Sequence, residues 1–415
     1  MSCAKAFLIA LLLSLPLPAL SAEIPGEMPG GIRDWFDLEN SPFIPIPEVG
    51  TDPNAGTTLG LLPVVLETDD KRQIRRIYAP DILIDPELGI GADFRVFSYP
   101  SADTQWYAVA GGKEHIERNL DLSFETGIQR QGSWSASSRL LYDRTASYRF
   151  FGFGNTSGHE TNYTGERAYL EGRLGRNLSP ALQLALDIRP RWLQAGPGGF
   201  AGLPSIESRF PGVPGLGANH EFLIRGFLTY DSRDFPDIPG FGSLLTAYAG
   251  TAQSAFLSGF SYSLFGFDLR HYERLSESAV LALHAAARYT IADSGTPFWA
   301  LASLGGESSI IGENQTLRGF GADRFIDRNL FSANIELRQR LFSLDLFSTR
   351  ISVEAAPFLD AGQVFHRLDQ SPFNHPHVAG GLGFRAVASP FIVGYVDVGF
   401  GTEGGAVFSG LDYPF

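Results

Sequence analysis

The sequence predicts an all-β fold, a transmembrane antiparallel β-barrel of about 16 strands with an extracellular loop that folds inward. Apolar and polar residues alternate with period two from about Thr57 to the end of the chain. Alternation alone also fits a soluble sandwich. The alternating segments, however, often reach ten residues, whereas soluble strands average about 5–6. Charged residues make up only 19% of the 415 residues, below the roughly 25% of a typical soluble domain.

Residues 1–22 have the pattern of a secretory signal peptide. Lys5 precedes the uncharged apolar run Ala6–Leu17, and small residues offer a cleavage site before Glu23. The run is shorter than the about 20 apolar residues of a membrane-spanning helix. An exported barrel is expected in the outer membrane of a Gram-negative bacterium.

Residues 23–56 are rich in proline, which disfavours helices and central strands. We predict that this stretch is a periplasmic N-terminal segment and that residues 57–415 form the barrel. The only cysteine, Cys3, lies in the signal peptide, so the mature chain has no disulfide and no thiol nucleophile. The formal charge of −13 argues against nucleic acid as a partner.

Strands follow from the alternation, as in the segment where Leu184, Leu186 and Ile188 alternate with Asp187 and Arg189. Counted back from the C-terminus, strands are expected near 404–415, 391–402, 376–388, 349–365, 330–342, 277–292, 258–272, 243–254, 219–231, 181–195, 161–177, 134–144, 116–130, 102–112 and 86–98. One more lies near 74–84 or 57–67. The polar faces carry charges of both signs, as a wet lumen would.

The last predicted strand ends in aromatic residues. Val407, Leu411, Tyr413 and Phe415 share one parity, with Ser409 as the polar exception. A terminal aromatic residue on an alternating strand is typical of outer-membrane barrels, so we interpret Tyr413 and Phe415 as a C-terminal barrel signal. The alternative is a plain last strand that ends in Phe by chance.

The segment from Gly305 to Asn329 is too long for an idle connection, since structureless loops beyond about 12–15 residues are usually functional or disordered. It contains Arg318 and Arg324. If the loop returned into the lumen, an arginine there would need a carboxylate partner. Glu336 lies on the polar face of the next strand, and Asp360 lies on the face of the following strand that we assign to the lumen. A guanidinium group suits carboxylates because it donates a planar pair of hydrogen bonds.

These segments resemble a known family. Leu317-Arg318-Gly319-Phe320, preceded by Leu304-Gly305-Gly306, resembles the Arg-Gly-aromatic loop motif of the BamA/TamA outer-membrane assembly superfamily, the bacterial surface antigen barrels. Asn334–Arg338 and Phe358–Gly362 are similar to that family's next two strands. The resemblance is specific in the C-terminal half, because the motifs occur in the right order and spacing.

A further motif lies upstream. Asp231-Ser232-Arg233-Asp234, with Pro239 and Gly242, is similar to the family's strand-end turn. Before Asp231 the resemblance rests on the alternating pattern alone. Known members carry periplasmic domains ahead of the barrel, and residues 23–56 are too few for one. The resemblance therefore implies a member that is a bare barrel.

The resemblance also implies a site and a function. The loop arginine Arg318 would dock on the lumenal acidic residues Glu336 and Asp360. The barrel's first and last strands would meet at a weak seam, where client strands pair before release into the lipid. The function would be to assist insertion or translocation of proteins at the outer membrane. The partners would be outer-membrane lipids, lipopolysaccharide and nascent outer-membrane or secreted proteins, with a monomeric barrel.

The sequence leaves two other function classes to consider, a solute pore and an enzyme. A pore for small solutes would use the same lumen. An enzyme finds little support, because Gly306-Glu307-Ser308 lacks the downstream glycine of a nucleophile elbow and no phosphate-binding loop occurs. His375 and His377 are two residues apart without an evident third ligand. We therefore predict no catalytic residue, no metal site and no cofactor.

Overall fold

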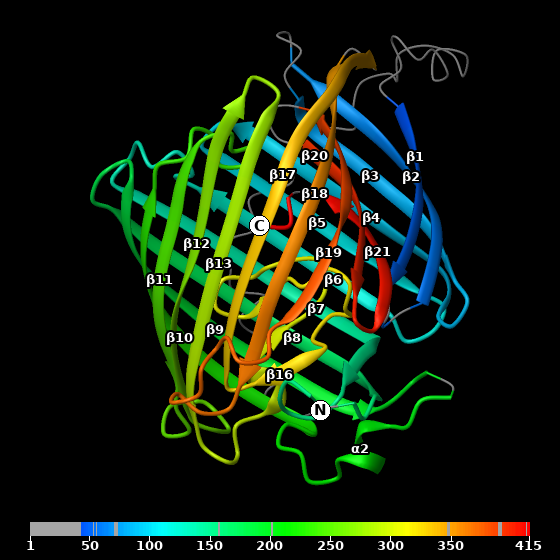
Figure 1. Cartoon of the computed structure of the whole chain (residues 1–415), viewed down its shortest axis with the longest axis vertical. Helices are drawn as coiled ribbons and strands as arrows, with labels where there is room; N and C mark the ends of the chain where they lie inside the picture. The colour runs from blue at the N-terminus through cyan, green and yellow to red at the C-terminus, as the bar shows by residue number, and fades with distance from the viewer. Residues whose placement is uncertain are drawn as a thin grey trace, which may run out of the picture.

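The structure is a computed structural model that describes residues 43–52, 54, 56–69, 74–156, 158–200, 202–346, 349–388, 392–411 and 413–415. Eighteen strands form one antiparallel sheet, in which each strand pairs with the next along the chain. The sheet curls into a barrel whose strands tilt against the long axis (Figure 1). The last strand returns to the first through one residue pair, Thr51 with Val407.

The strands of the barrel vary from 8 to 18 residues in length. They are β1 (Phe43–Asp52), β2 (Gly56–Thr68), β3 (Ile74–Asp85), β4 (Gly89–Ser101), β5 (Thr104–Lys113), β6 (Arg118–Thr126), β7 (Trp134–Phe150), β8 (Thr161–Asn177), β9 (Leu182–Pro197), β10 (Gly217–Asp231), β11 (Gly242–Ala252), β12 (Tyr262–Ser276), β13 (Ala279–Ala292), β17 (Asn329–Leu346), β18 (Thr349–Phe365), β19 (His377–Ala388), β20 (Ile392–Gly401) and β21 (Gly404–Leu411). The long segment between β13 and β17 emerges at one end of the barrel, which we call the loop end.

The all-β barrel class is confirmed, but the sheet has two more strands than the 16 predicted. Both candidates for the first strand form, as β2 and β3, and β1 precedes them. The prediction that residues 23–56 lie outside the barrel is wrong for Phe43–Asp52. Pro45 and Pro47 fit in β1 because they are two residues apart and withhold their N–H groups from the same strand edge. Residues 1–42, which include the predicted signal peptide, lie outside the described residues.

The two faces of the sheet follow the predicted alternation. On β9, Leu184 and Leu186 point outward and are 48% and 52% exposed, whereas Asp187 points into the lumen and is fully buried. An apolar exterior and a polar interior suit a barrel in lipid, where backbone groups are satisfied by pairing between neighbouring strands. In the described part of the chain, no helix is long and apolar enough to cross a membrane.

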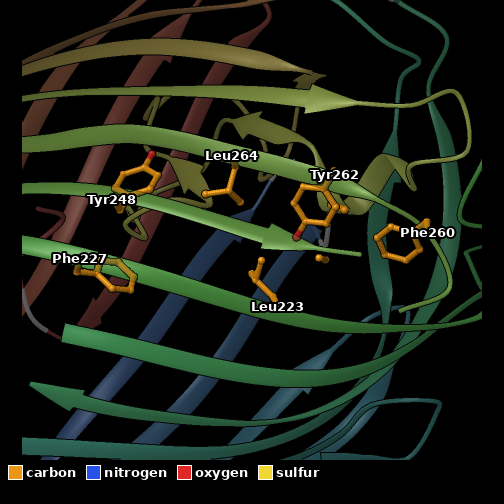
Figure 2. Packing of buried hydrophobic residues seen from close by; sticks show 8 residues of the cluster. Leu223, Phe227, Tyr248, Phe260, Tyr262 and Leu264 are labelled. Carbon is orange, nitrogen blue, oxygen red and sulfur yellow. The ribbon is translucent and has the colours of Figure 1, made fainter. Parts of the chain in front are cut away.

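Part of the lumen is apolar, which the alternation did not predict. A buried cluster covers the inner face of β10–β12 (Figure 2). Its members are Leu223, Phe227, Tyr248, Ala252, Phe260, Tyr262, Leu264 and Ala300. Trp299 and Ile311, from the segment between β13 and β17, pack against it. The cluster therefore attaches that segment to the barrel wall.

The segment between β13 and β17 folds back into the barrel, as predicted. It contains a 3-10 turn, Phe298–Ala300, and a small sheet of β14 (Ala302–Leu304), β15 (Asn314–Gln315) and β16 (Phe325–Asp327). A short helix, α2 (Ile206–Arg209), lies in the connection between β9 and β10. We call residues 305–328 the plug loop.

The end of the chain differs from the prediction. The last strand stops at Leu411 instead of continuing to Phe415. Residues Tyr413–Phe415 turn into the lumen, where Phe415 is 3% exposed and stacks on His284 with 5.1 Å between ring centres. Figure 1 accordingly places the C-terminus within the barrel. The apolar parity of Tyr413 and Phe415 reflects burial in the lumen.

Candidate functional site

The two glycine-containing motifs of the plug loop pair with each other. The Leu317 N–H donates to the Gly306 carbonyl at 3.0 Å, and the Gly306 N–H donates to the Phe320 carbonyl at 3.1 Å. Gly306 and Gly319 have φ angles of +83° and +128°, in a region of backbone conformation that residues other than glycine rarely adopt. The backbone of Leu304-Gly305-Gly306 therefore shapes the turn that presents Arg318.

Arg318 points into the lumen and is completely buried. Its Nε and Nη2 atoms donate to the two carboxylate oxygens of Asp360, each at 2.9 Å, and its backbone N–H donates to Asp360 at 3.0 Å. Its Nη1 donates to Glu336 at 2.7 Å. The guanidinium carbon lies 3.6 Å from the ring centre of Phe358. The structure thus brings together all three of the charged residues that the sequence analysis selected for this site.

Three further charged residues complete the network. Arg318 also donates to Asp397 of β20 at 3.0 Å. Arg385 of β19 donates to Glu336 at 3.0 Å and also bonds Asp397. Arg338 of β17 donates to Glu336 at 3.0 Å. Three arginines therefore balance three carboxylates in a buried cluster that joins the plug loop to four neighbouring strands.

Asp397 and Arg385 are site residues that were not predicted from the sequence, although a signal was available. On β19 and on β20, every second residue faces the lumen, and Arg385 and Asp397 are the one charged residue in each of these two sets. Their neighbours Phe384 and Val396 face outward. A lone charge among apolar lumenal neighbours needs an opposite charge nearby. Arg385 and Asp397 lie on adjacent strands, β19 and β20, so their pairing with each other follows from strand order, whereas Glu336 lies two strands from Arg385 and three strands from Asp397.

Apolar packing and close backbone approach hold the rest of the motif. Leu317 and Phe320 are buried in a cluster with Leu304, Phe325, Leu330, Val364, Ala302 and Ala379. A Cβ atom on Gly319 would lie 2.8 Å from the backbone nitrogen of Gly401. Glycine is therefore required where the loop crosses the end of β20.

Glu313 anchors the opposite side of the plug loop. It forms ion pairs with Arg189 of β9 and Arg225 of β10, and Arg225 also pairs with Asp187 and Glu171 at 2.8 Å and 2.7 Å. Burial disfavours the charged carboxylate, but the adjacent guanidinium groups outweigh burial and hold the pKa of Glu313 well below its ordinary value. Ion pairs thus attach the plug loop to two separate parts of the barrel wall, β9–β10 through Glu313 and β17–β20 through Arg318.

The C-terminal residues Tyr413–Phe415 lie next to the Arg318 cluster. Tyr413 lies 3.5 Å from the guanidinium carbon of Arg338 and donates to Glu354 at 3.2 Å. The Tyr272 hydroxyl donates to the Phe415 carbonyl at 3.2 Å, and the Ser309 N–H of the plug loop donates to the Pro414 carbonyl at 3.3 Å. The loop and the chain end together fill the middle of the lumen.

The strand-end motif lies at the other end of the barrel, away from this cluster. Asp231 accepts from the Arg233 side chain twice at 2.9 Å. Asp234 accepts from the N–H groups of Gly240 and Phe241. With Pro239 in the same connection, these contacts fix the turn between β10 and β11. The motif is structural in character and touches no part of the plug loop among the described residues.

Replacing Gly242 with alanine should destabilise that turn. Gly242 has φ +103°, and a Cβ atom there would lie 2.3 Å from the Ser232 carbonyl oxygen. The expected loss of unfolding free energy is about 1–3 kcal/mol, measured as a lower midpoint of urea unfolding in detergent. Gly226→Ala is the matched control, because a Cβ atom there meets nothing within 4 Å. Equal midpoints for both variants would contradict the prediction.

The chemistry of the cluster suits mechanical attachment. All three carboxylates accept hydrogen bonds from guanidinium groups, so each is committed to an arginine.

A cavity of about 100 Å³ lies between the plug loop and the wall; Arg189, Glu313 and Trp299 are among its lining residues. Its walls come from the loop and the barrel together, so its size depends on the position of the loop.

One solved structure shows the same type of fold, and two others are similar at lower TM-scores. The chain is similar to BamA from Haemophilus ducreyi lacking POTRA domains 1–3, at 14% identity and TM-score 0.50 over 89% of this chain and 74% of that chain. It is similar to CdiB from Escherichia coli at 12% identity and TM-score 0.47, over 88% and 62%. Wzi, a carbohydrate-binding barrel of Escherichia coli, gives 12% identity and TM-score 0.41 over 90% and 83%.

Comparison of the sequence itself identifies the family. Among curated proteins, none matches this sequence significantly. Residues 105–391, more than half of the chain, match the Omp85 superfamily domain. This match includes the strand-end motif, the plug loop and the strands that carry Glu336 and Asp360, and it confirms the resemblance drawn from those residues. The chain belongs to the Omp85 superfamily.

Proposed function

We propose that this barrel resides in the outer membrane and assists insertion or translocation of other proteins there, through a seam between β1 and β21. The observation that carries the proposal is the unequal pairing around the ring. In the described residues, β1 and β21 share one residue pair, whereas β20 and β21 share eight. Unpaired strand edges are templates for added strands.

The filled lumen supports this function over a solute pore. The plug loop and the chain end occupy the middle of the barrel, and ion pairs hold the loop on both sides. A wide aqueous path of the kind that general pores use would need these contacts to break. A strand edge at the seam works without such a path, because the added strand enters from the side.

A disulfide across the seam tests the proposal. Thr51 and Val407 are direct partners, and opposed residues of antiparallel strands have Cα atoms about 4.5–5.5 Å apart, within disulfide range. The one native cysteine, Cys3, lies in the predicted signal peptide. The Thr51→Cys/Val407→Cys protein in lipid vesicles should accelerate folding of a small urea-unfolded outer-membrane barrel when reduced. Oxidation should abolish the acceleration, and a reductant should restore it.

The controls separate the alternatives. Each single-cysteine variant should be indifferent to oxidation. Equal acceleration by the locked and unlocked seam would contradict the proposal. Flux of small sugars through the locked barrel, at the rate of the unlocked one, together with no acceleration of folding in either state, would favour the pore.

A further inference from the structure

The plug loop touches both hairpins that border the seam. One is the β1–β2 hairpin, whose turn contains Asn54, and the other is the β20–β21 hairpin, whose turn contains Glu403. Both turns lie at the loop end. Between them, the strands themselves are joined in the described residues by the single pair Thr51 with Val407. Contacts from the loop to both hairpins add a second link across the seam.

On the β1 side, the contact runs through Asn54. Its Nδ2 atom donates to the Ala322 carbonyl at 2.8 Å, and its own carbonyl accepts from the Arg149 guanidinium of β7. Asn54 is 6% exposed, and a Cβ atom on Gly321 would lie 2.2 Å from its Oδ1 atom. The loop backbone and the hairpin turn therefore fit against each other without space for a larger residue at Gly321.

On the β21 side, the contact runs through Arg324. Its Nε and Nη2 atoms donate to the two carboxylate oxygens of Glu403 at 2.7 Å and 2.6 Å. The guanidinium carbon also lies 4.0 Å from the ring centre of Phe151. The Arg324 side chain is 8% exposed and that of Glu403 is 43% exposed, so water and salt weaken this pair but do not remove its two-pronged geometry.

We propose that residues Gly321–Arg324 are a clasp that joins the two hairpins across the seam. Four consecutive residues reach Asn54 on one side and Glu403 on the other, next to the Arg318 anchor. Releasing the clasp would let the edges of β1 and β21 part. Admission of a client β-strand to the parted edges is the step that rests on the function proposed above; the clasp itself does not depend on it.

Spin-label distances across the seam test the clasp. Thr57 and Thr402 are exposed residues near the two turns, and their cysteine variants provide one label on each hairpin. The parent protein in vesicles should give a single narrow distance distribution. Asn54→Ala/Arg324→Glu should add a component longer by about 5 Å or more, the spacing of one strand. Heat-modifiable mobility on a gel would check that the barrel is folded.

A charge swap and a remote pair provide the controls. Adding Glu403→Arg to Asn54→Ala/Arg324→Glu should restore the narrow distribution, because the pair forms in reverse. Arg367→Glu should leave it unchanged, since Arg367 pairs with Asp369 in the β18–β19 connection, away from the seam. A narrow distribution in Asn54→Ala/Arg324→Glu would overturn the clasp. A widened seam that nevertheless fails to accelerate client folding would retain the clasp and reject the proposed function.

Discussion

Arg318→Ala is expected to release the plug loop from the lumen while the barrel stays folded. The substitution leaves Asp360, Glu336 and Asp397 without the guanidinium group that joins all three to the loop. Breaking a buried ion pair by removing one partner costs about 3–5 kcal/mol. The barrel sheet itself loses no hydrogen bond, because Arg318 belongs to no barrel strand. The loss should therefore appear as local opening of the loop.

Trypsin provides the measurement. Arg324 lies six residues beyond the substitution and is buried in the folded loop, so cleavage after it reports the open state. Cleavage should accelerate by about 100-fold, following the change in the open population, at unchanged strand content by circular dichroism. The cleavage rate of Arg318→Lys should lie between those of the parent protein and Arg318→Ala, because an ammonium group cannot form the paired hydrogen bonds to Asp360. Arg367→Ala is the control for an exposed arginine. Unchanged cleavage in Arg318→Ala would show that the remaining contacts of the loop hold it without Arg318.

Deletion of Gly312–Phe325 is expected to open the lumen to ions. This stretch carries the Glu313 and Arg318 anchors and the Arg324 clasp. Single-channel conductance of the refolded barrel should be small and flickering in the intact protein. In the deletion it should rise several-fold and become steady, because the loop residues that carry the Glu313, Arg318 and Arg324 contacts are gone from the middle of the lumen.

A surface deletion controls for altered length. Removing Ala255–Leu257 shortens the exposed turn between β11 and β12, where Phe256 and Leu257 are 54% and 67% exposed. It should leave conductance unchanged. A large, steady conductance in the intact protein that neither deletion alters would reject the plugged barrel and favour a solute pore.

The alternation predicted most strands because lipid and lumen impose period two on every residue of a barrel wall. The strand near 57–67 and that near 74–84 were treated as alternatives, but the barrel uses both. β1 was not predicted because Pro45 and Pro47 argue against a central strand. A strand can hold these prolines when one of its edges has few backbone hydrogen bonds, as the β1 edge toward β21 does. That position in the ring cannot be derived from the local sequence. Similarly, the parity of Tyr413 and Phe415 cannot distinguish outward lipid from a return into the lumen.

The Arg318 site was predictable for residues that lie in a sequence motif and also on the predicted lumenal face of a strand. Arg318, Glu336 and Asp360 lie in short motifs at fixed spacing, and their pairing follows from the topology of adjacent strands. Asn54 was out of reach, because it meets Ala322 across 268 positions of sequence through a backbone carbonyl that carries no residue signature. Glu403 sits in an ordinary turn, and its partner Arg324 had several carboxylates available.

The unequal heights of the wall have a consequence for the surrounding bilayer. β17 has 18 residues and β21 has eight. At about 3.3 Å per residue, β21 extends about 26 Å along its own axis, and tilt lowers its height further. That is less than the roughly 30 Å thickness of a hydrocarbon core. In the outer membrane, where we propose that the barrel resides, lipid tails beside β21 would shorten or disorder to match it, next to the strands that share one residue pair among the described residues.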